Sequence, residues 1–192
     1  MSRHQYFIAI LFIIGCNASL STERIAPRIE FQHFSFSTPN TDTWKLIDKT
    51  DRQAVFAIRH GRAIYRITII ENYIYDQQIR SLPAKEAADD YRNHEKFRLM
   101  EFCEKREMYE LHDLTMNDEQ IDNKVFYTMK YLTRNPQIFQ SASLYLYYPF
   151  EKENNYFLIA HYCEAAPNKG LLIFSFESDF LQLLKTVSHI TK

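Results

Sequence analysis

The amino-acid sequence predicts an α+β fold, in which an antiparallel β-sheet is covered by helices within a single domain. Several segments alternate apolar and polar residues with the period of two that is typical of strands. Two longer segments instead repeat apolar residues at helical spacings of three and four. The chain of 192 residues is rich in aromatic side chains, with 13 Tyr and 15 Phe, and holds only three Gly. It is long enough for one domain with a sizeable core.

The N-terminus predicts export. Arg3 and His4 precede an uninterrupted apolar or aromatic run over residues 6–14. These nine residues are fewer than the roughly 20 that a bilayer-spanning helix needs, so the run is typical of a cleaved signal peptide and not of a permanent anchor.

Ile13-Ile14-Gly15-Cys16 follows at the end of this run and resembles the lipobox of bacterial lipoproteins. The resemblance implies that residues 1–15 are removed as the signal peptide and that the sulfur of Cys16 carries lipid. Ordinary signal-peptidase cleavage after Ala18 is the alternative. Asn17 is not the Asp that commonly retains lipoproteins in the inner membrane, so the resemblance implies sorting to the outer membrane in a cell with two membranes.

Residues 16–28 are small or polar and show no period, which predicts a flexible, lipid-anchored tether. The folded domain is then expected over residues 29–192. Without Cys16, the cysteines that remain are Cys103 and Cys163. In an oxidising envelope this pair can form a disulfide, whereas two unrelated buried thiols are the alternative.

Strand patterns occupy most of the domain. Residues 54–60 and 63–73, joined by the turn around Gly61, predict a hairpin with Tyr65, Ile67 and Ile69 on one face. A strand before Met116 is expected to reach the strand at 124–132 through a polar turn at 117–123.

Two further strands are expected at 141–149 and 156–162. In the first of these, Leu144 and Leu146 lie on the face opposite to Tyr145 and Tyr147. A covering helix over the two tyrosines is favoured, with an open binding strip as the alternative.

Helices are predicted at residues 81–102 and 176–190. In the first, Ser81 is a candidate N-cap, Pro83 lies in the first turn, and Glu95 interrupts the apolar stripe. The second begins with acidic residues and ends with Lys185 and His189, as the helix dipole favours.

This order of elements resembles the PsbP-like α/β/α sandwich family, which includes bacterial envelope lipoproteins of the DcrB kind. The features concerned are FSFSTP leading to Trp44, a helix after RSLPA, the Tyr-rich strand YLYYP and the closing apolar helix. The resemblance implies the sandwich fold over residues 29–190, but none of its features is a catalytic signature.

No motif predicts a catalytic residue, a metal site or a cofactor. Apart from His4, the histidines stand apart without a metal-binding spacing, at positions 33, 60, 94, 112, 161 and 189. His161 and Cys163 would point to the same side of a strand, where a core histidine is the favoured interpretation. The acidic residues Asp113, Asp118, Glu119 and Asp122 lack the calcium-loop pattern and are typical of a turn.

We therefore expect a lipid-anchored envelope lipoprotein that acts as a non-enzymatic protein-interaction module. Its expected partners are the membrane, through the lipid on Cys16, and a protein of the envelope. With 23 basic and 24 acidic residues, nothing in the charge favours nucleic acid. The alternatives are a periplasmic carrier of a small apolar ligand and a secreted enzyme whose site has no recognisable motif.

Overall fold

The computed structural model describes residues 28–39, 43–106, 109–135, 137–149, 155–172 and 175–190. The predicted signal peptide and the lipid attachment residue Cys16 lie outside these ranges. So does the predicted tether, except for its last residue, Arg28, which begins the first strand.

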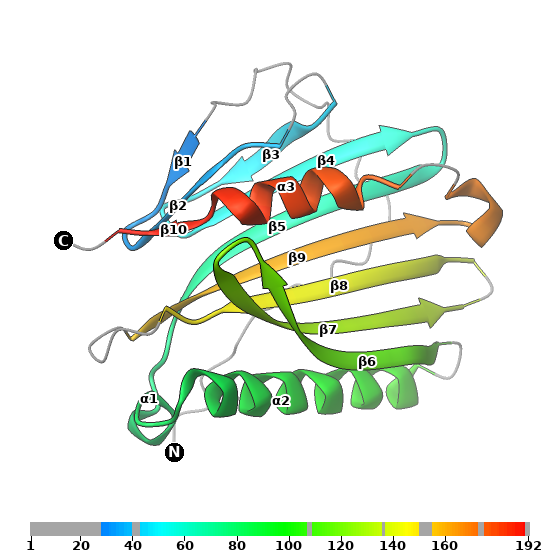
Figure 1. The fold of residues 1–192 in the computed structure, drawn as a ribbon. Helices are drawn as coiled ribbons and strands as arrows, with labels where there is room; N and C mark the ends of the chain where they lie inside the picture. Colours follow the sequence, from blue (N-terminus) through cyan, green and yellow to red (C-terminus); the bar gives the residue numbers. More distant parts are fainter. Residues whose placement is uncertain are drawn as a thin grey trace.

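A seven-stranded antiparallel sheet forms the centre of the molecule, in the strand order β3-β4-β5-β9-β8-β7-β6 (Figure 1). A smaller sheet has the order β1-β2-β10. The strands are β1 (Arg28–Glu30), β2 (Phe34–Ser37), β3 (Lys45–Lys49), β4 (Gln53–His60), β5 (Ala63–Tyr73), β6 (Glu110–Ile121), β7 (Lys124–Arg134), β8 (Phe139–Tyr147), β9 (Tyr156–Ala166) and β10 (Ser188–His189).

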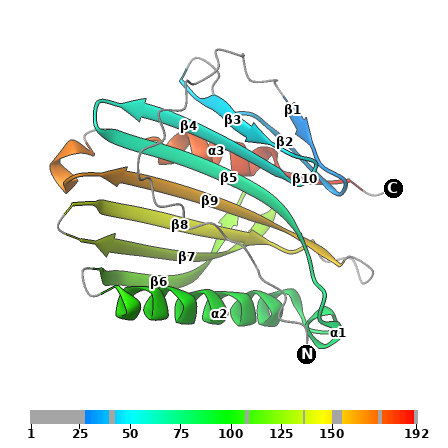
Figure 2. The same ribbon diagram turned by 180° about the vertical axis from the view of Figure 1, so that it is seen from behind.

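Helices lie on both faces of the large sheet, as Figures 1 and 2 show from opposite sides. They are α1 (Gln77–Arg80), α2 (Ala84–Lys105) and α3 (Glu177–Thr186), with a short 3₁₀ helix η1 (Lys169–Leu171). Helix α2 packs on one face near β6 and β7, and α3 packs on the other face together with the small sheet. The predicted α+β class, with helices covering an antiparallel sheet, is confirmed.

Each face of the large sheet has its own apolar core. Beneath α3, the rings of Tyr145 and Phe180 meet with centroids 5.3 Å apart, and the Trp44 indole donates a hydrogen bond to Asp179 at 3.0 Å. Beneath α2, the core includes Leu99, Leu144 and Leu146. Tyr145 is thus covered by a helix, as the sequence predicted.

A buried carboxylate joins the small sheet to the large one. Glu71 of β5 is almost fully buried, and it accepts hydrogen bonds from the backbone N–H of His33 at 2.8 Å and from its ring Nδ1 at 2.9 Å. The His33 ring also stacks on Tyr156 at 3.7 Å. A buried carboxylate is stable only when it is hydrogen-bonded, so this contact fixes the turn between β1 and β2.

The predicted hairpin around Gly61 is confirmed, because His60 pairs with Ala63 across a two-residue turn. The predicted turn at 117–123 is wrong for most of its length. Strand β6 continues to Ile121, and only Asp122 and Asn123 make the turn. The polar side chains that suggested a loop belong to an edge strand, where they form ion pairs such as Glu119 with Lys130 at 3.0 Å.

The helix ends also differ from the prediction. Asp76 caps α1, accepting a hydrogen bond from the Gln78 N–H at 2.7 Å, while Ser81 ends α1 and does not cap α2. Helix α3 stops at Thr186, because Ser188 and His189 pair with β2 instead. The Ser188 hydroxyl lies 2.8 Å from that of Ser35, a contact that a continued helix would lose.

Candidate binding pocket beneath helix α2

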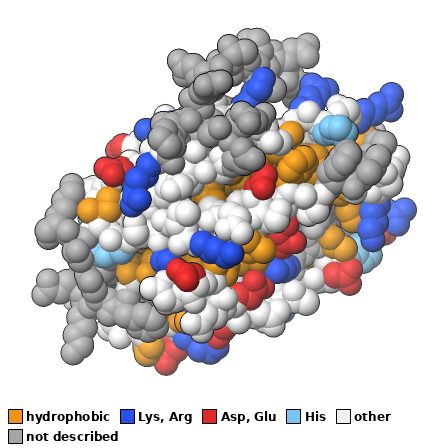
Figure 3. Space-filling model, turned by 45° about the horizontal axis from the view of Figure 1, so that its top comes forward, with side chains coloured by type: hydrophobic (Ala, Val, Ile, Leu, Met, Phe, Trp, Pro, Cys, Tyr) orange, Lys and Arg blue, Asp and Glu red, His pale blue; other side chains and the backbone are white. Residues whose placement is uncertain are grey.

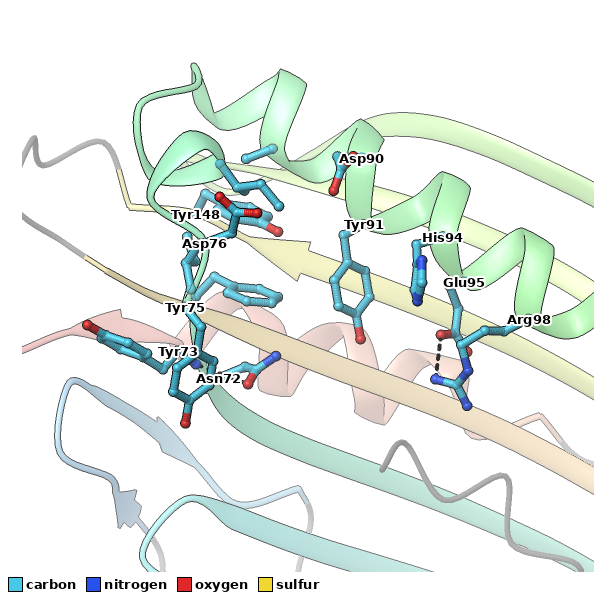
Figure 4. Close-up of a pocket in the computed structure, with 14 residues that line it drawn as sticks. Asn72, Tyr73, Tyr75, Asp76, Asp90, Tyr91, His94, Glu95, Arg98 and Tyr148 are labelled. Carbon is cyan, nitrogen blue, oxygen red and sulfur yellow. Dashed lines mark hydrogen bonds and ion pairs between the residues drawn. The ribbon is translucent and has the colours of Figure 1, made fainter. Parts of the chain in front are cut away.

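A half-open pocket of about 180 Å³ lies where α1 and the first half of α2 meet the ends of the central strands. Figure 4 shows side chains of α2 reaching toward the sheet, opposite side chains from the end of β5. The lining residues are Asn72, Tyr73, Ile74, Tyr75, Asp76, Ile79, Ala87, Asp90, Tyr91, His94, Glu95, Arg98, Tyr148 and Phe157.

Aromatic rings form the wall on the sheet side. Tyr148, just after β8, stacks on Phe157 of β9 with centroids 4.7 Å apart and the ring planes nearly parallel. Tyr91 of α2 meets Phe157 edge-on at 5.4 Å. Burial raises the pKa of the Tyr148 hydroxyl, so this group stays neutral and the wall is uncharged.

The buried end of the pocket carries a carboxylate. The Glu95 side chain is 7% exposed, and one of its oxygens lies 3.0 Å from Arg98, one helical turn further along α2. Burial raises the pKa of Glu95, although the positive charges of Arg98 and His94 oppose this shift. The neighbouring positive charges therefore offset only part of the hydration free energy that the carboxylate loses on burial.

The rim is formed by the segment between β5 and α1. Arg80 stacks over Tyr73, with its guanidinium carbon 4.7 Å from the ring centroid, and donates hydrogen bonds to the Tyr73 hydroxyl and the Ile74 carbonyl, each at 2.6 Å. These contacts hold the segment in place beside the exposed carboxylates of Asp76 and Asp90.

Helical geometry explains the position of Glu95. It lies four residues after Tyr91 and four before Leu99, so all three share the stripe that faces the sheet. The sequence showed this residue only as an interruption of the apolar stripe, and the pocket itself was not predicted. A carboxylate inside an apolar stripe was the signal that could have indicated it.

Exposed apolar side chains lie on and beside the two helices that border the pocket, and one of them, Tyr75, lines it. Five large apolar residues are exposed among the described residues, and four of them fall between positions 75 and 100: Tyr75 (57%), Leu82 (38%), Phe97 (68%) and Met100 (39%). Phe97 follows the pocket residue His94 by three positions and precedes Met100 by three, so these residues are neighbours along α2. We refer to Tyr75, Leu82, Phe97 and Met100 as the α1–α2 surface. The fifth residue, Ile47 (40%), lies on β3.

The charges on one face of the molecule are mixed. In Figure 3, Lys and Arg side chains are interspersed with Asp and Glu side chains over the visible face. None of the described helices is long and apolar enough to cross a membrane.

Of the two alternatives for the cysteine pair, the structure has unpaired thiols and not the possible disulfide, since Cys103 of α2 and Cys163 of β9 are both free. Burial raises the pKa of both thiols, that of Cys163 to about 12. Both side chains are therefore protonated near neutral pH, and the thiolates that oxidation needs are disfavoured.

The other polar residues considered from the sequence are dispersed. His161 lies beside Cys163 on the α2 face of β9, and its pKa is lowered to about 4, because burial and the charge of Arg66 both oppose protonation. Asp118 pairs with Lys85 and with Arg92 of α2, so this carboxylate secures the helix. No group of three or more metal-ligating side chains occurs within the described ranges.

Comparison with known proteins finds no matching family model and no matching curated protein. Among solved structures, the chain is similar to a crystal structure from Bacteroides thetaiotaomicron, with 12% identity and a TM-score of 0.41 over 83% of this chain. It spans about half of that longer chain, 46%. It is also similar to the solution structure of cyanobacterial PsbP (CyanoP) from Synechocystis sp. PCC 6803, with 13% identity and a TM-score of 0.49 over 93% of this chain and 99% of that one.

Proposed function

We propose that the protein is a non-enzymatic binding module, held at a membrane of the cell envelope through lipid on Cys16, which docks an envelope protein on its α1–α2 surface. The proposal joins two features. The N-terminal sequence supports the anchor, and the α1–α2 surface supports the docking.

The position of the exposed apolar residues carries the docking proposal. Four of the five exposed large apolar residues in the described part of the chain lie on or beside α1 and α2, and one of them, Tyr75, lines the pocket. Single exposed apolar residues are ordinary, but a group beside a concave site is typical of a surface that a partner covers. A lipid anchor would add to the affinity, because it confines the module to the membrane where its partner is found.

Metabolic labelling with a fatty acid tests the anchor. The full chain is expected to take up the label in a bacterium that processes lipoproteins, and a Cys16→Ser variant is expected to take up none. Label in that variant, or an intact Cys16 without label, would contradict the anchor.

Site-specific photocrosslinking tests the docking surface. A photoreactive residue at position 97 is expected to crosslink to a discrete envelope protein in cells, because Phe97 is the most exposed of the four apolar residues. The matched control places the same residue at position 47, where Ile47 is similarly apolar but lies on β3. Equal crosslinking at both positions would argue against a docking surface on α2.

A carrier of a small apolar ligand is the second candidate, and the stacked rings of Tyr148 and Phe157 favour it. Native mass spectrometry of the exported protein distinguishes the two, since a carrier retains a small molecule and a docking module does not.

A further inference from the structure

We propose that the pocket beneath α2 binds an ammonium group on an apolar stem, such as the lysine side chain of the docked partner. This inference rests on the proposed docking function and names the chemical group that enters the site. Its basis is the size, the charge and the aromatic lining of the pocket.

The volume sets the size of the occupant. A cavity of about 150 Å³ holds a benzene molecule, whereas pockets for drug-sized ligands measure roughly 300–1,000 Å³. At about 180 Å³, this pocket fits one long side chain or one single-ring molecule. Because the pocket is open on one side, a side chain that projects from a docked protein can reach it.

The charge of the lining favours a cation. Three carboxylates line the pocket, those of Asp76, Asp90 and Glu95, against the guanidinium of Arg98 and the ring of His94. Arg98 lies 3.0 Å from Glu95, so these two charges partly offset each other, and Asp76 and Asp90 supply the remaining negative charge. Asp90 is exposed, and the other nearby cation, Arg80, is not among the lining residues and is engaged with Tyr73 and Ile74.

The aromatic lining favours the same kind of ligand. Aromatic rings attract organic cations through the negative potential of their faces, and the attraction is stronger where water is excluded. The contact between Arg80 and Tyr73 shows that a cation already stacks within this cluster of rings. An ammonium on an apolar stem can place its methylene groups against Tyr91 and Phe157 while its charge approaches a carboxylate.

The buried carboxylate of Glu95 favours entry of the cation into the pocket. Its carboxylate is nine-tenths buried and its pKa is raised by that burial. A second positive charge nearby would stabilise the ionised form and return its pKa toward the ordinary range. An anionic ligand would add repulsion at the same point.

Side-chain mimics test the inference directly. The probes are Nα-acetyl-lysine N-methylamide, its uncharged norleucine counterpart, benzylamine and benzoate, titrated into the full exported chain in detergent micelles and followed by NMR. The lysine derivative is expected to bind with a dissociation constant on the order of 1 mM, as suits a small ligand, and to shift the signals of Tyr91, His94 and Arg98. The norleucine derivative and benzoate are expected to cause no saturable shift.

Two variants and a control connect binding to the pocket. Asp90→Asn removes an exposed carboxylate of the lining without disturbing the core, and it should weaken binding at least about threefold. Glu95→Gln should weaken it further. Glu86→Gln makes the same chemical change on an exposed residue of α2 outside the pocket, so binding should be unchanged.

The outcomes distinguish between two ligands, the lysine side chain of a partner and a free amine. Binding of the lysine derivative supports a partner's side chain, and binding of benzylamine alone overturns that source in favour of a free amine. If neither amine binds, or if benzoate binds as well, the inference is wrong. If crosslinking at position 97 still occurs when the ammonium inference has failed, the docking proposal stands independently of that inference.

Discussion

His161 shows how one strand position sets a response to pH. It faces the α2 side of the sheet, where its strand neighbours are Thr68 and Leu144 and no carboxylate is paired with it in register. Its pKa is lowered from 6.5 to about 4 by burial and by the charge of Arg66. The folded protein therefore keeps this ring neutral at pH values where the unfolded chain protonates it.

This difference makes the protein less stable in mild acid. Above about pH 6.5 both states are neutral at His161 and the residue contributes no pH dependence. As the pH falls from 6.5 toward 4, the unfolded state binds a proton that the folded state does not, so the free energy of unfolding decreases. We expect His161 to account for a loss of about 2 kcal/mol in the free energy of unfolding. This value is smaller than full burial would give, because the side chain is partly exposed.

A His161→Gln variant is expected to lose less stability than the wild type between pH 7.5 and pH 4.5, as measured by urea unfolding at each pH. His60→Gln, a change at an exposed hairpin end, is the control and should follow the wild type. Parallel pH profiles for the wild type and His161→Gln would show that the ring is not buried in this way.

Glu95 shows which part of the site the sequence could indicate. The helical period correctly placed it on the stripe that faces the sheet, and the carboxylate was visible as an interruption of that stripe. The surrounding rings could not be predicted. Tyr148 and Phe157 come from separate strands, and only the pairing of β8 with β9 brings them together.

Among the elements, the β4–β5 hairpin depends on one glycine. Gly61 has φ +59°, and nothing lies within 4 Å of the Cβ that another residue would place there. The cost of a side chain is therefore purely one of backbone conformation. Gly61→Ala is expected to lower the free energy of unfolding by about 1 kcal/mol, since residues with a Cβ rarely adopt this region.

Gly170→Ala in η1 provides the comparison. Gly170 does not have a positive φ, and an added Cβ would lie 3.4 Å from the Asn168 side chain, which is near ordinary contact. Chemical denaturation should show a change within about 0.5 kcal/mol for this variant. Equal losses for both variants would mean that the turn conformation is not what Gly61 supplies.

The elements were predicted well where a local pattern decided them and poorly where a distant partner did. The strands at 54–60 and 63–73 alternate clearly and have a turn residue between them, so their hairpin was correct. The sequence of strand β6 is polar because β6 is an edge strand, and its side chains form ion pairs with α2 and with Lys130. The end of α3 depends on β2, which lies about 150 residues earlier in the chain and is invisible to any local pattern.

At the scale of the whole molecule, the sheet separates two cores with different polar contacts. The core beneath α3 joins to the small sheet through Glu71 and His33, and α2 is fastened by the buried Arg92, which donates to the carbonyls of Asn117 at 2.8 Å and Thr128 at 3.2 Å. The α+β class followed from the sequence, because it depends only on the order and type of elements. The pocket did not, because it forms where the end of β5 turns under α2.

This arrangement places four of the exposed apolar residues on or beside α1 and α2, and Ile47 on the far edge strand β3. Docking at the α1–α2 surface is the central claim. It requires that changes on α2 affect partner binding and that an equivalent change on β3 does not.

Quantitative capture of the crosslinked envelope protein by the full lipidated chain tests this claim most directly. Phe97→Ser is expected to reduce the captured amount at least about tenfold, since a buried aromatic contact is often a main contributor to an interface, while Ile47→Ser leaves it unchanged. Both changes replace an exposed apolar side chain, so both variants should fold. Equal capture by the two variants, or a loss in Ile47→Ser alone, would contradict the claim.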